Sequence, residues 1–290
     1  MRKFYIIGNG FDINHNLPTN YKYFREYIRV NNPSLEHRIS AEFCNFGDED
    51  SKLWNDFENS LSYFDIDYFS SKIDYSLMYQ DNIRGEFSDS SWYDTQYNLS
   101  EETEIFYELK KMFSDWIGSI EVYNIERKYN FSPSDYFLNF NYTQTLEEAY
   151  SIRAGQICHI HGCMGDNFIV GHNIKYSDEF QNLKMDPDGG DLLYNPYNED
   201  FRIEELREII SDRTNSFYKP IKEELIFKLE EWLNKFSNPS EIIVIGHSFG
   251  KSDWEYFAYL QERYPDSKWH YNCFDIKTQE NLKEMLNTIS

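Results

Sequence analysis

Short apolar runs that end in turns of small or polar residues constrain the fold of this chain more than any other feature. Runs of about four to eight apolar residues with such boundaries are typical of strands buried on both faces of a sheet. The clearest runs are KFYII (3–7), YFLNF (136–140), QICHIH (156–161), EIIVI (241–245) and KWHYNCFDI (268–276). FIVG (168–171) predicts a further short strand.

Segments with helical spacing separate these runs. Thr19 or Asn20 can cap a helix that begins near Tyr21, and WEYFAYLQERY (254–264) predicts another helix. Strands that alternate with helices favour a mostly parallel sheet with helices on both faces. The chain is therefore predicted to be an α/β protein.

A large helical insertion is predicted to interrupt the α/β core. Residues 1–34 and 132–290 are assigned to the core, and residues 35–131 to the insertion. Within the insertion, Ser100 precedes two glutamates and is predicted to cap a helix, since acidic residues favour the first turn. Residues 177–200 are rich in Asp, Gly, Asn and Pro and predict a long loop.

Polar turns follow four of the predicted strands. The carboxyl ends of parallel strands lie at one edge of a sheet, which is where ligands bind in such folds. We therefore expect these turns to converge on one site. They are GNGFD (8–12), NYT (141–143), HG (161–162) and GHSFG (246–250).

The first turn resembles part of a phosphate-binding loop. Gly8 and Gly10 would let backbone N–H groups, including that of Asn9, approach a phosphate or a ribose. The third glycine of the dinucleotide fingerprint is missing, because Ile13 stands in its place. An ordinary tight turn is the alternative. Asp12 could bind a sugar hydroxyl or cap the turn.

The second and third turns supply the candidate catalytic residues. Asn141 can hydrogen-bond a ribose hydroxyl, a carboxamide or a water, or it can simply close its turn. In HIHG, His159 and His161 are predicted to lie on one face of a strand at period two, and Gly162 would leave room for a substrate beside a general base at His161. The two alternatives are a metal site with His172 as a third ligand, and a structural histidine pair.

The fourth turn matches the nucleophile elbow G-x-S-x-G, with Ser248 as the nucleophile. A hydrolase of that kind needs a histidine after the serine, and His270 lies inside an apparent strand. A turn in which Gly246 and Ser248 contact a nucleotide is therefore favoured over a serine hydrolase.

Composition excludes several classes of protein. The formal net charge of −22 over 290 residues repels phosphate backbones, so general nucleic-acid binding is not expected. No apolar run approaches the roughly 20 residues of a membrane helix, and the amino-terminal run is too short for a signal peptide, so a cytoplasmic location is expected. The four cysteines form no CxxC pair, so no zinc site of that type, and no other metal, is expected.

The ordered set of these motifs resembles the AbiH family of phage abortive-infection proteins. The matching blocks span nearly the whole chain, although the helical segments between them carry little specificity. The blocks are GNGFD with NY after it, NFNYT-x-TLEE, HIHG with GH after it, and IGHSFGKSDWEYF.

A more distant resemblance is to the sirtuin-like NAD-binding fold. Asp12 replaces a serine of that pattern, Thr143 replaces an aspartate, and the zinc-binding cysteines are missing, so peptide deacylation is not expected. The nearer analogue is the sirtuin-like branch that degrades NAD in phage defence. The matching positions are Gly8–Asp12, Leu17-Pro18-Thr19, Asn141, His161-Gly162 and Gly246-His247-Ser248.

The resemblance implies hydrolysis of the N-glycosidic bond of NAD⁺, which would arrest an infected cell. His161 would act as general base and Asn141 would orient the ribose or the water. The Gly8–Gly10 turn would hold the pyrophosphate, and Ser248 and Asp253 would contact the far ribose. A non-catalytic nucleotide sensor is the alternative. Expected partners are a small-molecule nucleotide, a phage or host protein as trigger, and a second copy of the chain, but no membrane.

Overall fold

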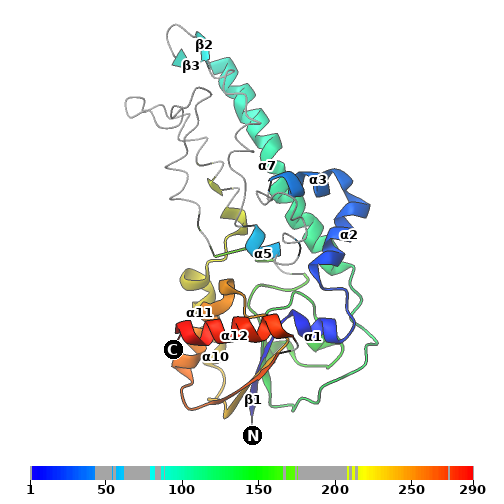
Figure 1. Cartoon of the computed structure of the whole chain (residues 1–290), viewed down its shortest axis with the longest axis vertical. Coiled ribbons are helices and arrows are strands. Elements are labelled where there is room, and N and C mark those ends of the chain that lie inside the picture. Colours follow the sequence, from blue (N-terminus) through cyan, green and yellow to red (C-terminus); the bar gives the residue numbers. More distant parts are fainter. Residues whose placement is uncertain are drawn as a thin grey trace. The chain divides into compact units, whose positions relative to one another are not determined.

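A computed structural model gives the fold of the chain (Figure 1). It describes residues 2–42, 54, 57–61, 79–81, 86–87, 89–165, 168–173, 175, 208, 211–212, 215–273 and 275–289. The predicted loop at 177–200 lies outside the described residues. Among the helices of the described part, none is long and apolar enough to cross a membrane.

The chain divides into two compact units. The first unit comprises residues 1–24, 113–173 and 219–290 and contains the large sheet. The second comprises residues 25–112 and 174–218. All of the candidate functional residues lie in the first unit, so the site can be described within one body.

The first unit is built on a five-stranded sheet with the order β5-β4-β1-β6-β7. All four neighbouring strand pairs are parallel, which confirms the predicted α/β class with a mostly parallel sheet. Numbered along the chain within this sheet, the order is 3-2-1-4-5, that of the first five strands of a Rossmann-type sheet. The strands are β1 (Lys3–Ile7), β4 (Tyr136–Asn139), β5 (Ile157–His159), β6 (Glu241–Ile245) and β7 (Lys268–Asn272).

The strands end level with one another. Ile7 pairs with Asn139 on one side and with Ile245 on the other, and Asn139 pairs with His159. The segments that follow these residues therefore leave the sheet at a common edge. This register places the four polar segments at one edge of the sheet, as predicted.

Alternate side chains of the strands point into two separate cores. Leu138 and Val244 belong to the core shared with helices α10, α11 and α12, whereas Phe137 and Ile245 belong to the core shared with α1 and α8. A sheet buried on both faces explains why the strands read as continuous apolar runs. These helices are α1 (Asn9–Asn14), α8 (Thr145–Glu148), α10 (Ile226–Leu233), α11 (Trp254–Arg263) and α12 (Ile276–Ile289).

The remaining described elements are mostly helical. A π-helical turn, Ile221–Leu225, leads into α10. Asn20 accepts a hydrogen bond from the backbone N–H of Lys22 at 3.0 Å, which confirms its predicted capping role. The other elements are α2 (Tyr21–Asn31), α3 (Pro33–Glu42), α5 (Phe57–Ser60), α7 (Asp89–Gly118) and a hairpin of β2 (Tyr79–Asp81) and β3 (Glu86–Phe87).

Three local predictions are wrong. The helix assigned to begin at Ser100 begins at Asp89, because the residues before Ser100 continue the same helix. The strand predicted at 168–171 does not form, although the Ile169 N–H donates to the carbonyl of His161 at 2.9 Å. The turn predicted at GNGFD is the start of α1, which follows β1 directly.

Candidate functional site

Three glycines form a close backbone contact where β1 and β6 end. The Gly8 N–H donates to the carbonyl of Ile245 at 3.0 Å, and the Gly10 N–H donates to that of Gly246 at 2.8 Å. A Cβ at Gly246 would lie 2.3 Å from the backbone nitrogen of Phe11, and its φ of +67° also favours glycine. These glycines are therefore required by the packing of the two chain segments.

This contact bears on the prediction that the Gly8–Gly10 segment binds a phosphate. The N–H groups of Gly8 and Gly10 already have backbone partners, and the Asn9 side chain donates to the carbonyl of Thr19 at 2.9 Å. A helix of six residues follows, with Gly8 at its N-cap position. The pyrophosphate role of this turn stays a prediction, and the observed contacts give the same residues a structural role.

A buried carboxylate lies one turn further along α1. Asp12 is fully buried, and its Oδ2 accepts a hydrogen bond from the Thr143 hydroxyl at 2.5 Å. Its other oxygen, Oδ1, has no hydrogen-bond partner among the described residues and no contact with solvent. An unsatisfied buried carboxylate oxygen is costly, so it points to a missing donor at this position.

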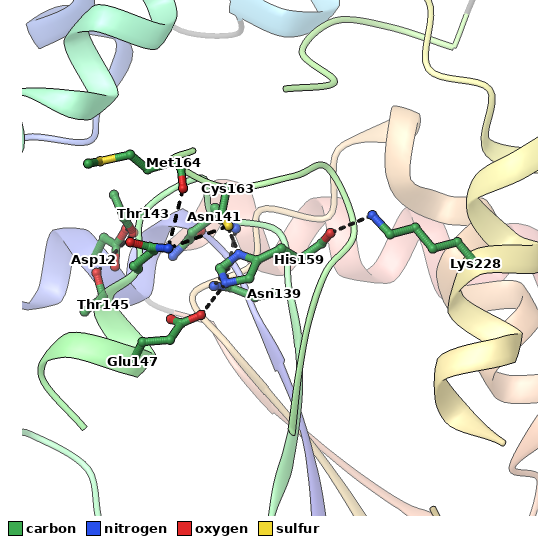
Figure 2. A network of polar contacts seen from close by, with 11 residues as sticks. Asp12, Asn139, Asn141, Thr143, Thr145, Glu147, His159, Cys163, Met164 and Lys228 are labelled. Atoms are coloured by element: carbon green, nitrogen blue, oxygen red, sulfur yellow. Dashed lines mark hydrogen bonds and ion pairs between the residues drawn. The ribbon is translucent and has the colours of Figure 1, made fainter. Parts of the chain in front are cut away.

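Asn141 presents a second set of unsatisfied polar atoms beside Asp12. Its side chain is buried, and neither Oδ1 nor Nδ2 makes a hydrogen bond of normal geometry to another described residue. Its backbone is well held, because its N–H donates to Oδ1 of Asn139 at 3.1 Å. Asn141 and Asp12 thus bring one carboxylate oxygen and one complete amide group to the edge between β1 and β4 (Figure 2).

The environment of Asp12 perturbs its ionisation. Burial raises the pKa of the carboxyl group from its ordinary value of 3.8 to about 6, and this effect outweighs all others. The hydroxyls of Thr143 and Thr145, the Asn141 amide and the charge of a protonated His159 oppose the rise in pKa by favouring the ionised form. A carboxyl group with a pKa near neutrality can both accept and release a proton under cellular conditions.

His159 was not predicted as a catalytic residue, but its contacts make it a functional candidate. Its Nε2 lies 2.7 Å from Oε1 of Glu147 on α8, and its Nδ1 lies 3.3 Å from the backbone oxygen of Asn141. His159 and Glu147 are largely buried, with 11% and 19% of their side chains exposed. Its position in HIHG is the sequence feature that could have identified it. His159 lies two residues after Ile157, so it points to the same face of β5, toward α8.

His161 lies apart from His159, because β5 ends at His159 and the chain turns. The ring of His161 is 3% exposed and packs against the rings of Phe140 and Tyr256, and its Nε2 lies 3.3 Å from the Tyr256 hydroxyl. Burial, followed by the charge of Lys219, holds its pKa well below the ordinary value. The imidazole is therefore neutral and weakly basic. The prediction that both histidines share one face is wrong.

The fourth turn packs beside His161. His247 also makes a T-shaped contact with the Phe140 ring, accepts the Phe249 N–H at its Nδ1 (2.9 Å), and has its Nε2 3.5 Å from Asp253. Burial lowers the pKa of His247 to about 3. Ser248 is exposed, and its carbonyl accepts a hydrogen bond from Asn281 at 2.9 Å.

A family model described as bacteriophage abortive infection AbiH matches residues 4–273. The chain belongs to the AbiH family. Membership covers the sheet, all four turns and both histidines, and it indicates a role in bacteriophage abortive infection. Among curated proteins and among solved structures no match is found, so the resemblance to sirtuin-like NAD-binding domains stays a prediction.

In this AbiH protein the predicted site residues fall into two groups. Asp12 and Asn141 meet at the edge between β1 and β4, whereas His161, His247 and Asp253 lie on the side of the core that contains Phe140 and Tyr256. Gly8, Gly10 and Gly246 form their backbone contact at the carboxyl ends of β1 and β6. Gly162 adopts a φ of +83° and donates its N–H to the carbonyl of His159 at 3.2 Å.

The sequence left open a metal site with His159, His161 and His172 as ligands. No group of three or more His, Cys, Asp or Glu side chains in the described part of this AbiH chain is arranged to hold a metal ion. Of the three histidines weighed for such a site, His159 is paired with Glu147, and His161 packs among aromatic rings. The described cysteines are free thiols.

Proposed function

We propose that this AbiH protein binds the ribose of NAD⁺ at Asp12 and Asn141 and hydrolyses the N-glycosidic bond to nicotinamide. The observation that supports the proposal is the pairing of an unsatisfied carboxylate oxygen with an unsatisfied amide at the carboxyl edge of a parallel sheet. Ribose hydroxyls and water are the groups that such a pair recognises, because each can donate and accept hydrogen bonds.

The exposed side chains around this pair define the side from which a ligand would enter. Ile13, the residue after Asp12, is 44% exposed, and Met164 is 47% exposed. The N–H of Met164 donates to the carbonyl of Tyr142, which holds it over the turn that carries Asn141. Ile13 and Met164 thus present solvent-exposed apolar side chains close in the chain to Asp12 and to the turn of Asn141, and such side chains suit the face of a nucleobase or nicotinamide ring.

Asp12 is assigned the role of general base. In the reaction, the water oxygen forms a bond to C1′ of the ribose while the C1′–N bond breaks and its electron pair neutralises the cationic nicotinamide. The proton released by the water passes to Oδ1 of Asp12. Because the pKa of Asp12 is raised to about 6, its ionised form is available at neutral pH and is a stronger base than an ordinary carboxylate.

Asn141 is assigned to orientation. Its amide can donate to a ribose hydroxyl and accept from the water, which would fix the angle of attack at C1′. In this proposal Asp12 takes the base role that the sequence assigned to His161. The depressed pKa of His161, which makes its ring a weak base, supports that change.

The test measures the release of nicotinamide from NAD⁺ by chromatography. It is run with and without extract of phage-infected cells. Asp12→Asn should lower the turnover rate by about 10²- to 10⁴-fold, the usual contribution of a general base. Asn141→Ala should also lower turnover. Asp266→Asn, a change of the same kind at an exposed position, is the matched control and should leave turnover unchanged.

His161→Gln separates the two assignments of the base. Retained turnover in this variant supports Asp12, and loss of turnover with Asp12→Asn still active returns the base role to His161. Calorimetry with NAD⁺ distinguishes the non-catalytic sensor, which would bind without releasing nicotinamide. A wild-type protein that neither binds NAD⁺ nor releases nicotinamide in either condition contradicts the proposed function.

A further inference from the structure

Both nitrogens of His159 face polar partners. Nε2 lies 2.7 Å from Oε1 of Glu147, while Nδ1 lies 3.4 Å from Nδ2 of Asn139 and 3.3 Å from the backbone oxygen of Asn141 (Figure 2). The imidazole thus connects the carboxylate on α8 to the segment at the end of β4. None of the contacts involves a residue outside the first unit.

The neighbouring amide identifies the tautomer of the neutral ring. The N–H of Asn141 donates to Oδ1 of Asn139, so Nδ2 of Asn139 is the atom turned toward His159. Nδ1 of His159 then accepts a hydrogen bond from that amide, and Nε2 carries the ring proton and donates a hydrogen bond to Glu147. A ring that also holds a proton on Nδ1 would donate to the carbonyl of Asn141 in its place.

The backbone of His159 is held as firmly as its ring. Nζ of Lys228, on α10, donates to the carbonyl oxygen of His159 at 3.0 Å and to that of Ile160 at 3.3 Å. The backbone contact comes from α10, and the ring contact comes from α8. His159 is consequently fixed from both faces of the sheet, as a residue that orients another group needs to be.

We infer that Glu147 and His159 form a positioning pair that holds the Asn139–Asn141 segment and thereby aims the Asn141 amide at the ligand beside Asp12. The inference rests on the proposed function for the identity of the ligand. The Asn141 amide makes no hydrogen bond of normal geometry to another described residue and lies beside the Asp12 carboxylate, so its direction depends on how the backbone of Asn141 is held. That backbone donates its N–H to Oδ1 of Asn139, whose amide in turn donates to Nδ1 of His159.

Two substitutions of His159 separate the contributions of its two ring nitrogens. In His159→Asn the new amide lies where Nδ1 was and can still bond Asn139, but it cannot reach Glu147. In His159→Gln the new amide lies where Nε2 was and can still bond Glu147, but it leaves Asn139 and Asn141 without a ring nitrogen. If the pair acts by positioning Asn141, His159→Asn should rescue function that His159→Gln loses.

The first measurement needs no ligand. Hydrogen exchange of the Asn141 backbone amide, followed by NMR, should be about 3- to 10-fold faster in His159→Gln than in the wild type, the change expected for one lost hydrogen bond. His159→Asn should lie closer to the wild type. Equal exchange rates in all three proteins overturn the inference, as does equal acceleration in both variants, which would mean that the ring only fills space.

The second measurement uses nicotinamide release from NAD⁺. His159→Gln and Glu147→Ala should lower kcat while KM for NAD⁺ stays within about twofold, because orientation affects the transition state more than ground-state binding. Thermal unfolding of each variant identifies any loss of fold. A change confined to KM, or one that follows thermal stability across the variants, overturns the inference.

The two measurements separate the inference from the proposed function. An Asn141 amide that responds to His159 in a protein inactive on NAD⁺ supports the positioning pair and contradicts the choice of substrate. An active protein whose Asn141 amide and kcat ignore both His159 variants contradicts the pair and leaves the proposed function standing.

Discussion

Replacing Asp12 with Asn should stabilise the protein at neutral pH while it removes the proposed activity. The carboxylate is fully buried with one unsatisfied oxygen, so its ionised form is disfavoured in the folded state. An amide of almost the same shape carries no charge and can still accept the Thr143 hydroxyl. Residues that serve function at a cost to stability behave in this way.

The magnitude follows from the raised pKa. The pKa of Asp12 rises from 3.8 to about 6 on folding. A difference of about 2 units at 1.36 kcal/mol per unit disfavours the ionised folded protein by about 3 kcal/mol. Because the folded pKa is the higher one, this penalty is absent below pH 3.8, grows as the pH rises through 6, and is complete at pH 7.5. At pH 5 it is roughly 1.5 kcal/mol.

The assay is urea unfolding of the wild type and Asp12→Asn at pH 7.5, 6, 5 and 4. The difference in free energy of unfolding between the two proteins should shrink by about 2.5 kcal/mol from the highest pH to the lowest. Any packing change caused by the amide is nearly constant with pH and cancels from this trend. A difference that is independent of pH, or one that grows toward pH 4, refutes the reasoning that burial disfavours the ionised form of Asp12.

Three further outcomes follow from the same contacts. Gly246→Ala should destabilise the fold by more than about 3 kcal/mol or prevent folding, because its Cβ meets backbone atoms within 3 Å; Gly155→Ala, with open space around it, should remain within about 1 kcal/mol of the wild type in urea unfolding. Thr143→Val should raise the pKa of Asp12 further, measured by carboxyl ¹³C titration, whereas Thr143→Ser should not. Cys158, which is buried and has its pKa raised to about 11, should not react with a disulfide reagent until the protein unfolds.

The central strands of the sheet could be predicted because most of their residues are buried. After their first, charged residue, KFYII and EIIVI are apolar at consecutive positions, a pattern that is typical of a strand covered on both faces. FIVG at 168–171 has the same composition but forms no strand. Composition alone could not reveal this, because pairing depends on whether a neighbouring strand has a free edge. Ser100 shows the corresponding limit for helices, since a good capping residue is also tolerated inside a helix.

The site was predicted in part because its residues follow strands. Asn141 and Asp12 were identified from the ends of two predicted strands, and the register places those ends together. His161 was chosen over His159 because Gly162 follows it, which leaves room for a substrate and matches the sirtuin-like pattern. The predicted strand was also extended two residues too far. The sequence does not reveal where β5 ends, since Ile160 continues the apolar pattern into the turn.

The three glycines explain why the candidate site lies between β1 and β4. In a sheet of this order the direction of strand addition reverses between β1 and β6, and ligands commonly bind in the crevice at that point. Here Gly8, Gly10 and Gly246 bring the two chain segments so close that a single added methyl group would meet the backbone. The turns after β1 and β6 therefore bond to each other. The unsatisfied polar atoms of Asp12 and Asn141 lie on the other side of β1, toward β4.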